Sequence, residues 1–121
     1  MVASKTTGQK PTDPNRIGDI SEYYAVTWLW DNGYEVFMNA GATGAVDMIA
    51  VDKSGKSILI DVKTMQKDYR SPTNIYSIRR VRSKEQKKLG VHFLAFNPET
   101  RKLHFVKHQD HGPEVHQHEL F

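Results

Sequence analysis

The sequence predicts an α/β domain in which a mixed β-sheet of about five strands is flanked by helices. Segments with helical and strand-like patterns follow one another in the order helix, three strands, helix, two strands, and this mixture is typical of a layered helix-and-sheet fold. The chain has 121 residues, of which 38% are hydrophobic. This is enough for one compact domain with a modest core, and a second domain is not expected.

Composition divides the chain into three segments. Residues 1–14 are mostly polar and are expected to form a flexible arm, residues 15–108 the folded domain, and residues 109–121 a polar, histidine-containing tail. The chain has no run of about eighteen apolar residues and no apolar signal segment, so we expect no membrane association. We expect a cytoplasmic protein, or a phage-encoded one that acts in the host cytoplasm. The absence of cysteine excludes disulfides and thiolate metal sites.

The first element is expected to be a helix from about Asn15 to Asp31. A polar cap followed by Pro14 begins it, and Asn32-Gly33 closes it. Its apolar residues cover more than one stripe, which predicts burial on more than one side. Glu22 lies on one of these apolar flanks, where a carboxylate is costly unless it is paired or bound to a metal.

Three strands are expected next. Tyr34 to Met38 forms the first, and a loop of small residues from Asn39 to Gly44 follows it. The loop either lets a phosphate backbone approach closely or is a plain turn, and it is not a P-loop, because no Gly-Lys-Ser/Thr follows. Residues Val46 to Val51 and Ser57 to Val62 are rich in β-branched and aliphatic residues, and the polar segment 52–55 between them predicts a hairpin.

This hairpin carries the charged residues that point to chemistry. Asp61 and Lys63 are two residues apart and therefore share a face of the strand, and pairing brings Asp47 close to Asp61. Two carboxylates and an ammonium suit metal-assisted hydrolysis of a phosphodiester, since Mg²⁺ takes oxygen ligands from one or two carboxylates, water and phosphate. The alternative is a solvated strand end with a surface ion pair.

These residues resemble the signature of the PD-(D/E)XK nuclease superfamily. Gly44-x-x-Asp47 is followed, after thirteen residues, by Asp61-Val62-Lys63, and Gly18 and Glu22 match the pattern of the preceding helix. The resemblance covers residues 16–96 and is strongest to archaeal-type Holliday-junction resolvases and intron-associated endonucleases. The signature proline is replaced by Val46, and the last acid is Asp rather than the commoner Glu, so its reach is one methylene shorter.

The resemblance implies a restriction-endonuclease-like core and a set of site residues. Asp47 and Asp61 would hold Mg²⁺, with Mn²⁺ as a substitute, the Val62 carbonyl would coordinate as well, and Glu22 would be an accessory ligand or position a water. Lys63 would lie next to the nucleophile. Cleavage would leave a 5′-phosphate and a 3′-hydroxyl.

Positive charge is concentrated directly after this motif. The whole chain has a net charge of +3, but residues 63–90 contain nine basic residues against two acidic ones. Such a concentration is typical of a surface that contacts nucleic-acid phosphates, and the alternative is a solvated face. The candidate DNA-binding residues are Lys67, Arg70, Arg79, Arg80, Arg82, Lys84, Lys87 and Lys88.

Two tyrosines lie among these basic residues. Tyr69 and Tyr76 either stack on bases of single-stranded or distorted nucleic acid, or Tyr76 packs in the core of a strand whose arginines point outward. Ser83 and Gln86 have the spacing of a capping box, which predicts a short helix that ends at Gly90. Either Gln86 or Lys87 is expected to face the site.

The last part of the domain is expected to complete the sheet. Residues 91–96 and 103–106 form a second hairpin around an Asn-Pro-Glu-Thr turn. The tail that follows contains His108, His111, His116 and His118. A zinc site there is one interpretation and a polar tail that docks on the domain is the other. Ser/His/Asp catalysis has little support, because no nucleophile elbow is present.

Three functions are compatible with these residues. The first, which the compact domain and the lack of a separate sequence-reading module favour, is a structure-selective, Holliday-junction-resolvase-like endonuclease that acts on branched or distorted DNA. The second is a sequence-specific homing or restriction-type endonuclease, and the third is a DNA-binding subunit without activity. A homodimer is expected, because so small a nuclease would need two sites to cut two strands.

Overall fold

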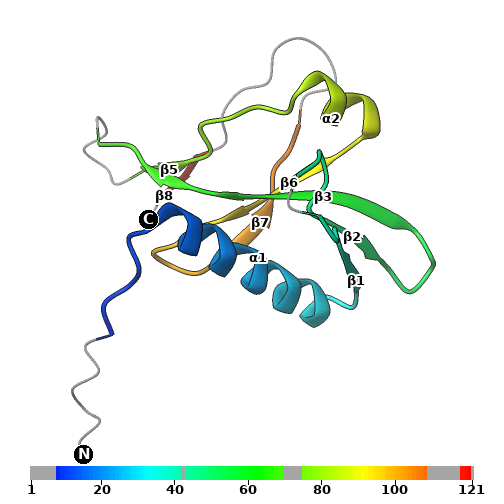
Figure 1. Cartoon of the computed structure of the whole chain (residues 1–121), viewed down its shortest axis with the longest axis horizontal. Coiled ribbons are helices and arrows are strands. Elements are labelled where there is room, and N and C mark those ends of the chain that lie inside the picture. The colour runs from blue at the N-terminus through cyan, green and yellow to red at the C-terminus, as the bar shows by residue number, and fades with distance from the viewer. Residues whose placement is uncertain (1–7, 42, 70–74, 109–117, 121) are drawn as a thin grey trace, which may run out of the picture.

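The computed structural model describes residues 8–41, 43–69, 75–108 and 118–120. Figure 1 shows the arrangement of its elements. The two helices are α1 (Pro14–Asp31) and α2 (Lys84–Leu89), and none of the described helices is long and apolar enough to cross a membrane. The strands are β1 (Glu35–Met38), β2 (Met48–Val51), β3 (Ser57–Thr64), β4 (Gln66–Lys67), β5 (Ile75–Ser77), β6 (His92–Phe96), β7 (Leu103–Phe105) and β8 (His118–Leu120).

Five of these strands form one mixed sheet in the order β1-β2-β3-β6-β7. The pair β3 and β6 is parallel, while β1–β2, β2–β3 and β6–β7 are antiparallel. In Figure 1 the helix α1 runs below the sheet and α2 lies above it. The predicted α/β class, with a restriction-endonuclease-like core of about five strands flanked by helices, is confirmed.

Both helices begin and end where local signals place them. The Asp13 carboxylate accepts a hydrogen bond from the Asn15 N–H at 3.0 Å, and Pro14 occupies the first turn, where its missing N–H costs no hydrogen bond. In α2 the Ser83 and Gln86 side chains satisfy each other's backbone N–H groups. Gly90 ends α2 with φ +75°, a left-handed conformation that glycine adopts without strain.

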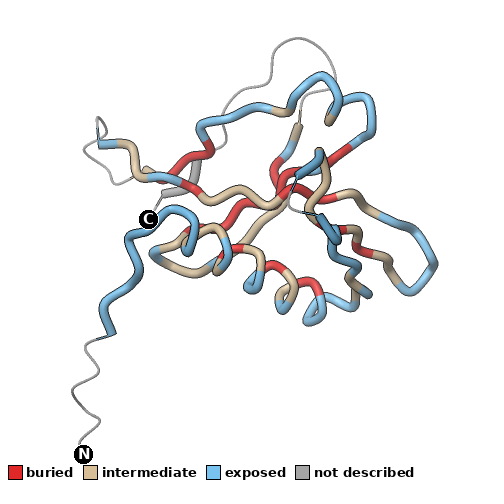
Figure 2. Tube along the Cα trace, viewed as in Figure 1, coloured by how far each residue is buried: buried red, intermediate tan, exposed pale blue. Residues whose placement is uncertain are grey.

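Buried residues lie in the central strands and along α1 (Figure 2), and they form two clusters, one on each face of the sheet. On the α1 face, six residues are at most 1% exposed: Ala25, Leu29, Met48, Ala50, Ile60 and Leu94. On the other face a second cluster forms from Met65, Tyr76, Ile78, Phe93, Ala95 and Val106. Strand β3 separates them, because Ile58, Ile60 and Val62 pack with the α1 face as expected. Asp61 and Lys63 therefore emerge on the α2 face.

A second, three-stranded sheet in the order β4-β5-β8 was not expected. Its strands have two or three residues each, too short to show an alternating pattern. Residues 118–120 pair antiparallel with β5, with Tyr76 opposite Glu119, so part of the predicted tail is a strand. The residues between 109 and 117, and residue 121, lie outside the described residues.

The predicted arm also differs in part from expectation. Residues 1–7 lie outside the described part of the chain. Lys10, however, donates a hydrogen bond from Nζ to the Glu99 carbonyl at 3.0 Å, and α1 already begins at Pro14. The segment from residue 8 onward therefore contacts the turn between β6 and β7.

Candidate active site

The candidate site begins where β2 and β3 separate. Asp47 stands one residue before β2, and its N–H donates to the Ile60 carbonyl at 2.8 Å. Its carboxylate oxygen Oδ2 accepts a hydrogen bond from the Val62 N–H at 2.7 Å. A continued antiparallel ladder would offer this N–H a backbone carbonyl. The Asp47 side chain takes that place, so the backbone ladder between β2 and β3 ends at this point.

The hydrogen bond from the Val62 N–H to Asp47 also indicates on which side of β3 the Val62 carbonyl lies. In a β-strand the N–H and C=O of one residue point toward the same neighbouring strand. The Val62 N–H points toward Asp47, so its carbonyl oxygen lies on the Asp47 side as well. This agrees with the role that the resemblance implies for Val62.

The two aspartates form a carboxyl pair. The register aligns Met48 with Ile60, which places Asp47 next to Asp61 at the end of the ladder. Asp61 is only 9% exposed. The pKa of Asp47 is raised from 3.8 to about 7, first because the group is buried and next because it shares a hydrogen bond with Asp61, while the Val62 N–H partly opposes the shift. Without a cation, the pair therefore retains a proton near neutral pH.

Two further side chains hold Asp61 from the α2 face. Lys63 Nζ lies 3.1 Å from Asp61 Oδ2, and Gln86 Nε2 donates to the same oxygen at 2.8 Å. The Lys63 ammonium also lies 5.2 Å from the centre of the Phe93 ring, which favours a fixed position for the charge. The Asp61 carboxylate is thus oriented by one ammonium and one amide.

Gln86, rather than Lys87, faces the site. Its Oε1 accepts from the Ser83 N–H at 3.0 Å, and its Nε2 donates both to Asp61 and to the Ala45 carbonyl at 3.1 Å. One amide therefore caps α2, fixes the loop before Asp47 and orients Asp61. Lys87 is exposed. The capping-box spacing predicted the first of these contacts, but nothing local in the sequence indicated the other two.

Glu22 approaches the carboxyl pair from α1. The neighbouring Ser21 is buried and forms a 2.6 Å hydrogen bond with Thr64 at the end of β3, which ties α1 to the site strand. The pKa of Glu22 is raised by burial, then by the charge of Asp19, then by that of Asp61. Glu22 and Asp47 line one cleft of about 550 Å³.

The fit of this site to a metal rests on the carboxyl pair. Among the described residues, no three acidic or histidine side chains lie close enough together to form a complete metal site, so Glu22 does not join Asp47 and Asp61 as a third direct ligand in this arrangement. Two carboxyl groups that share a hydrogen bond supply the hard oxygen donors that Mg²⁺ prefers, and its other ligands are usually water and phosphate. The residues present therefore fit a divalent cation held by two carboxylates.

Asn39 is a positioning residue that the sequence did not single out. Its N–H donates to the Asp47 carbonyl at 2.9 Å, and its side-chain Nδ2 donates to the Val46 carbonyl at 2.8 Å. A Cβ on Gly44 would lie 3.3 Å from the same Nδ2, and Gly44 has φ +125°. The glycine of the motif is thus required by the fold of the loop that carries Asp47. An asparagine before a glycine-rich loop was the available signal.

The basic residues divide into groups with different surroundings. Arg80, Lys84, Lys87 and Lys88 are exposed. Arg82 is half-buried and donates to the Val91 carbonyl at 3.3 Å, and Arg79, which is exposed, donates to the Lys67 carbonyl at 3.2 Å. Arg70 lies outside the described residues. The guanidinium of Arg82 is therefore engaged in holding the chain before α2.

The two tyrosines and the histidines are placed differently from one another. Tyr76 is 8% exposed in the core, as the structural alternative predicted, whereas Tyr69 is 86% exposed. His108 accepts a hydrogen bond at Nε2 from the Phe93 N–H at 3.0 Å, which gives it a structural contact. His111 and His116 lie outside the described residues, so the zinc interpretation of the tail stays a prediction.

Comparison with known proteins shows a likeness in fold to a solved structure. No protein-family model and no curated protein matches the chain. Among solved structures, the chain is similar to a bacterial homing endonuclease, I-Ssp6803I, with 20% sequence identity and a TM-score of 0.67. The match covers 87% of this chain and 75% of that chain. A likeness at this identity shows that the two chains share a fold.

Proposed function

We propose that this protein is a metal-dependent endonuclease that hydrolyses phosphodiester bonds of DNA. One observation carries the proposal: the paired carboxyl groups of Asp47 and Asp61 lie at the separation of β2 and β3, with the Lys63 ammonium 3.1 Å from Asp61. The fold that the chain shares with a homing endonuclease supports the same reaction class.

Each residue of the site has a proposed role. Asp47, Asp61 and the Val62 carbonyl are the oxygen donors for Mg²⁺, or for Mn²⁺ in its place. The bound cation supplies Lewis-acid chemistry and lowers the pKa of a coordinated water. Lys63 stabilises negative charge that develops on the phosphate and orients the attacking water. Glu22, at the edge of the same cleft, holds a water through its half-buried carboxylate.

We propose a sequence-specific duplex as the substrate. The likeness in fold to a homing endonuclease, which covers 87% of this chain, supports this alternative over a four-way junction. A duplex has two strands, and the described residues carry one carboxyl pair. We therefore propose that two copies of the chain act together, and light scattering at micromolar concentration tests this.

The test of the function is cleavage of a randomised duplex library in Mg²⁺, with sequencing of the ends produced. We expect a recurrent cut site, 5′-phosphate ends and no cleavage by Asp61→Asn, which keeps the size of the side chain. A four-way junction of fixed sequence is run beside the library. Cleavage of the junction alone would replace the sequence-specific proposal by the resolvase, and cleavage that Asp61→Asn retains would refute the assigned site.

A further inference from the structure

A second hollow adjoins the cleft of the candidate site. Pro14, the first residue of α1, lines both the cleft that contains Asp47 and a separate pocket of about 410 Å³. Thr64, which follows Lys63 directly, also lines this pocket. The two hollows are therefore adjacent, with the first residue of α1 between them.

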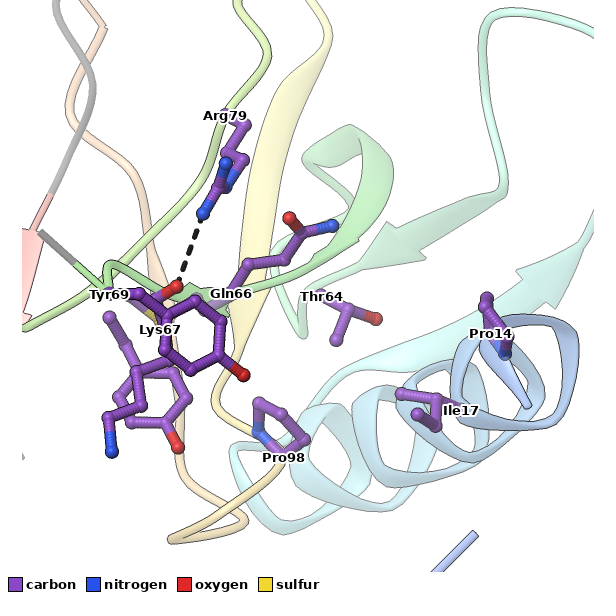
Figure 3. Close-up of a pocket in the computed structure, with 10 residues that line it drawn as sticks. Pro14, Ile17, Thr64, Gln66, Lys67, Tyr69, Arg79 and Pro98 are labelled. Atoms are coloured by element: carbon purple, nitrogen blue, oxygen red, sulfur yellow. Dashed lines mark hydrogen bonds between the residues drawn. The ribbon is translucent and has the colours of Figure 1, made fainter. Parts of the chain in front are cut away.

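The walls of the pocket combine apolar, aromatic and cationic groups (Figure 3). Its apolar lining comes from Pro14, Ile17, Met65 and Pro98. Tyr69 projects beside Pro98, opposite the first turns of α1, and Arg79 extends toward Lys67. This is the composition of a small-ligand site, in which a mainly apolar cavity carries a few fixed polar groups.

Tyr69 is the distinctive group of this pocket. It is 86% exposed, although it lines a cavity whose other tyrosine, Tyr76, is buried in the core. An aromatic ring in this position offers a free face on which a planar group can stack. Every nucleobase has such a face, and stacking on it does not depend on sequence.

Arg79 makes the pocket favourable for a negatively charged group. Its guanidinium donates to the Lys67 carbonyl at 3.2 Å, which holds the cation at the pocket wall, and a guanidinium has further N–H donors for a phosphate. Gln66 and Thr64 add polar groups to the lining. The pocket is a half-open hollow, and a base that is paired and stacked within a duplex has no free face to lay on the Tyr69 ring, so an occupant that stacks there is an unpaired base.

We propose that this pocket binds one unpaired nucleobase of the substrate strand, stacked on Tyr69, with its phosphate on Arg79. The inference rests on the proposed function and adds to it that a nucleotide beside the scissile phosphate leaves the helical stack. The base stacks on the ring face, and the Gln66 and Thr64 side chains are positioned to contact its edge.

The experiment compares two fluorescein-labelled single strands of about twelve nucleotides, one of mixed sequence and one with abasic sugars throughout. Binding to the full-length protein is measured by fluorescence anisotropy in EDTA, which prevents cleavage. We expect the base-containing strand to bind at least about fivefold more tightly than the abasic strand, the lower end of the effect of one stacked base. Tyr69→Leu abolishes this difference and Tyr69→Phe retains it.

Tyr23→Leu is the matched control, because Tyr23 is an equally accessible tyrosine, 77% exposed, that does not line this pocket. It must leave the difference unchanged. Equal binding of the two strands by the unaltered protein, or a difference that survives Tyr69→Leu, overturns the pocket whatever the duplex-cleavage result. A difference that depends on Tyr69 supports the pocket even if no duplex is cleaved, in which case only the proposed nuclease function fails.

Discussion

The carboxyl pair predicts that the unaltered protein is less stable than its Asp47→Asn variant at alkaline pH in the absence of a divalent cation. The folded-state pKa of Asp47, about 7, lies above its ordinary value of 3.8. The neutral carboxyl therefore contributes stability that is fully present below pH 3.8 and is lost as the pH rises through about 7. Asparagine keeps an acceptor for the Val62 N–H and removes the charge.

The magnitude follows from the size of this shift. A rise of about three pKa units corresponds to about 4 kcal/mol for a group fully shielded from water. Asp47 is only half-buried, and solvent screening reduces the effect to about 1–2 kcal/mol. For a chain of this length, about 1 kcal/mol changes the melting temperature by about 4 °C. We therefore expect Asp47→Asn to melt about 4–8 °C higher than the unaltered protein at pH 8 in EDTA.

The assay is thermal unfolding followed by circular dichroism, at pH 4 and pH 8, in EDTA and in excess Mg²⁺. The advantage of Asp47→Asn should shrink at pH 4, and Mg²⁺ should stabilise only the unaltered protein. Asp52→Asn is the control, because a hydrogen bond from the Ser54 side chain lowers the pKa of Asp52, so this change should reduce stability at pH 8. An Asp47→Asn variant that melts no higher than the unaltered protein at pH 8 would show that the pair is not a source of instability.

Three further changes test the roles of other residues. Lys63→Met should reduce the rate of cleavage by about 10²–10³-fold with little change in DNA affinity, as single-turnover kinetics would show, and an equal loss of affinity would instead make Lys63 a binding residue. Gln86→Ala should lower the free energy of unfolding by about 0.5–2 kcal/mol through loss of the cap, and it should also slow cleavage measured without denaturant. Ser83→Ala, measured in parallel, should lower the stability alone. The three exposed lysines of α2 are Lys84, Lys87 and Lys88. Replacing all three by serine should make the slope of log binding constant against log salt concentration shallower, by the equivalent of up to about three phosphate contacts. An unchanged slope would show that α2 does not contact DNA.

The elements that the sequence predicted correctly carry local signals. The helix from Pro14 to Asp31 has a cap and a proline at its start, α2 has a capping box, and each hairpin has a polar turn. Asp47 and Asp61 could be placed together because a short hairpin fixes its own register. These features depend on residues close in sequence, so they are visible without the tertiary structure.

The features that escaped prediction depend on distant residues. Strand β8 pairs with β5 from far along the chain, with Ile75 opposite Leu120, and the strands β4, β5 and β8 are too short for a pattern. Which of the two tyrosines is covered depends on the second core cluster, which includes Tyr76 and leaves Tyr69 exposed. Gln86 could not be distinguished from Lys87, since its contact with Asp61 spans 25 residues and needs α2 to dock above β3.

The position of β3 between a hairpin partner and a parallel partner sets an order of assembly. Asp47 and Val62, in contact through the hairpin, are 15 residues apart, so the carboxyl pair depends on a short loop closure. The parallel pairing of β3 with β6 needs the longer crossover that contains β4, β5 and α2. Contacts of higher sequence separation form more slowly. The two acids are therefore expected to meet early in folding, and the arrival of α2 with Gln86 is the late event that completes the site.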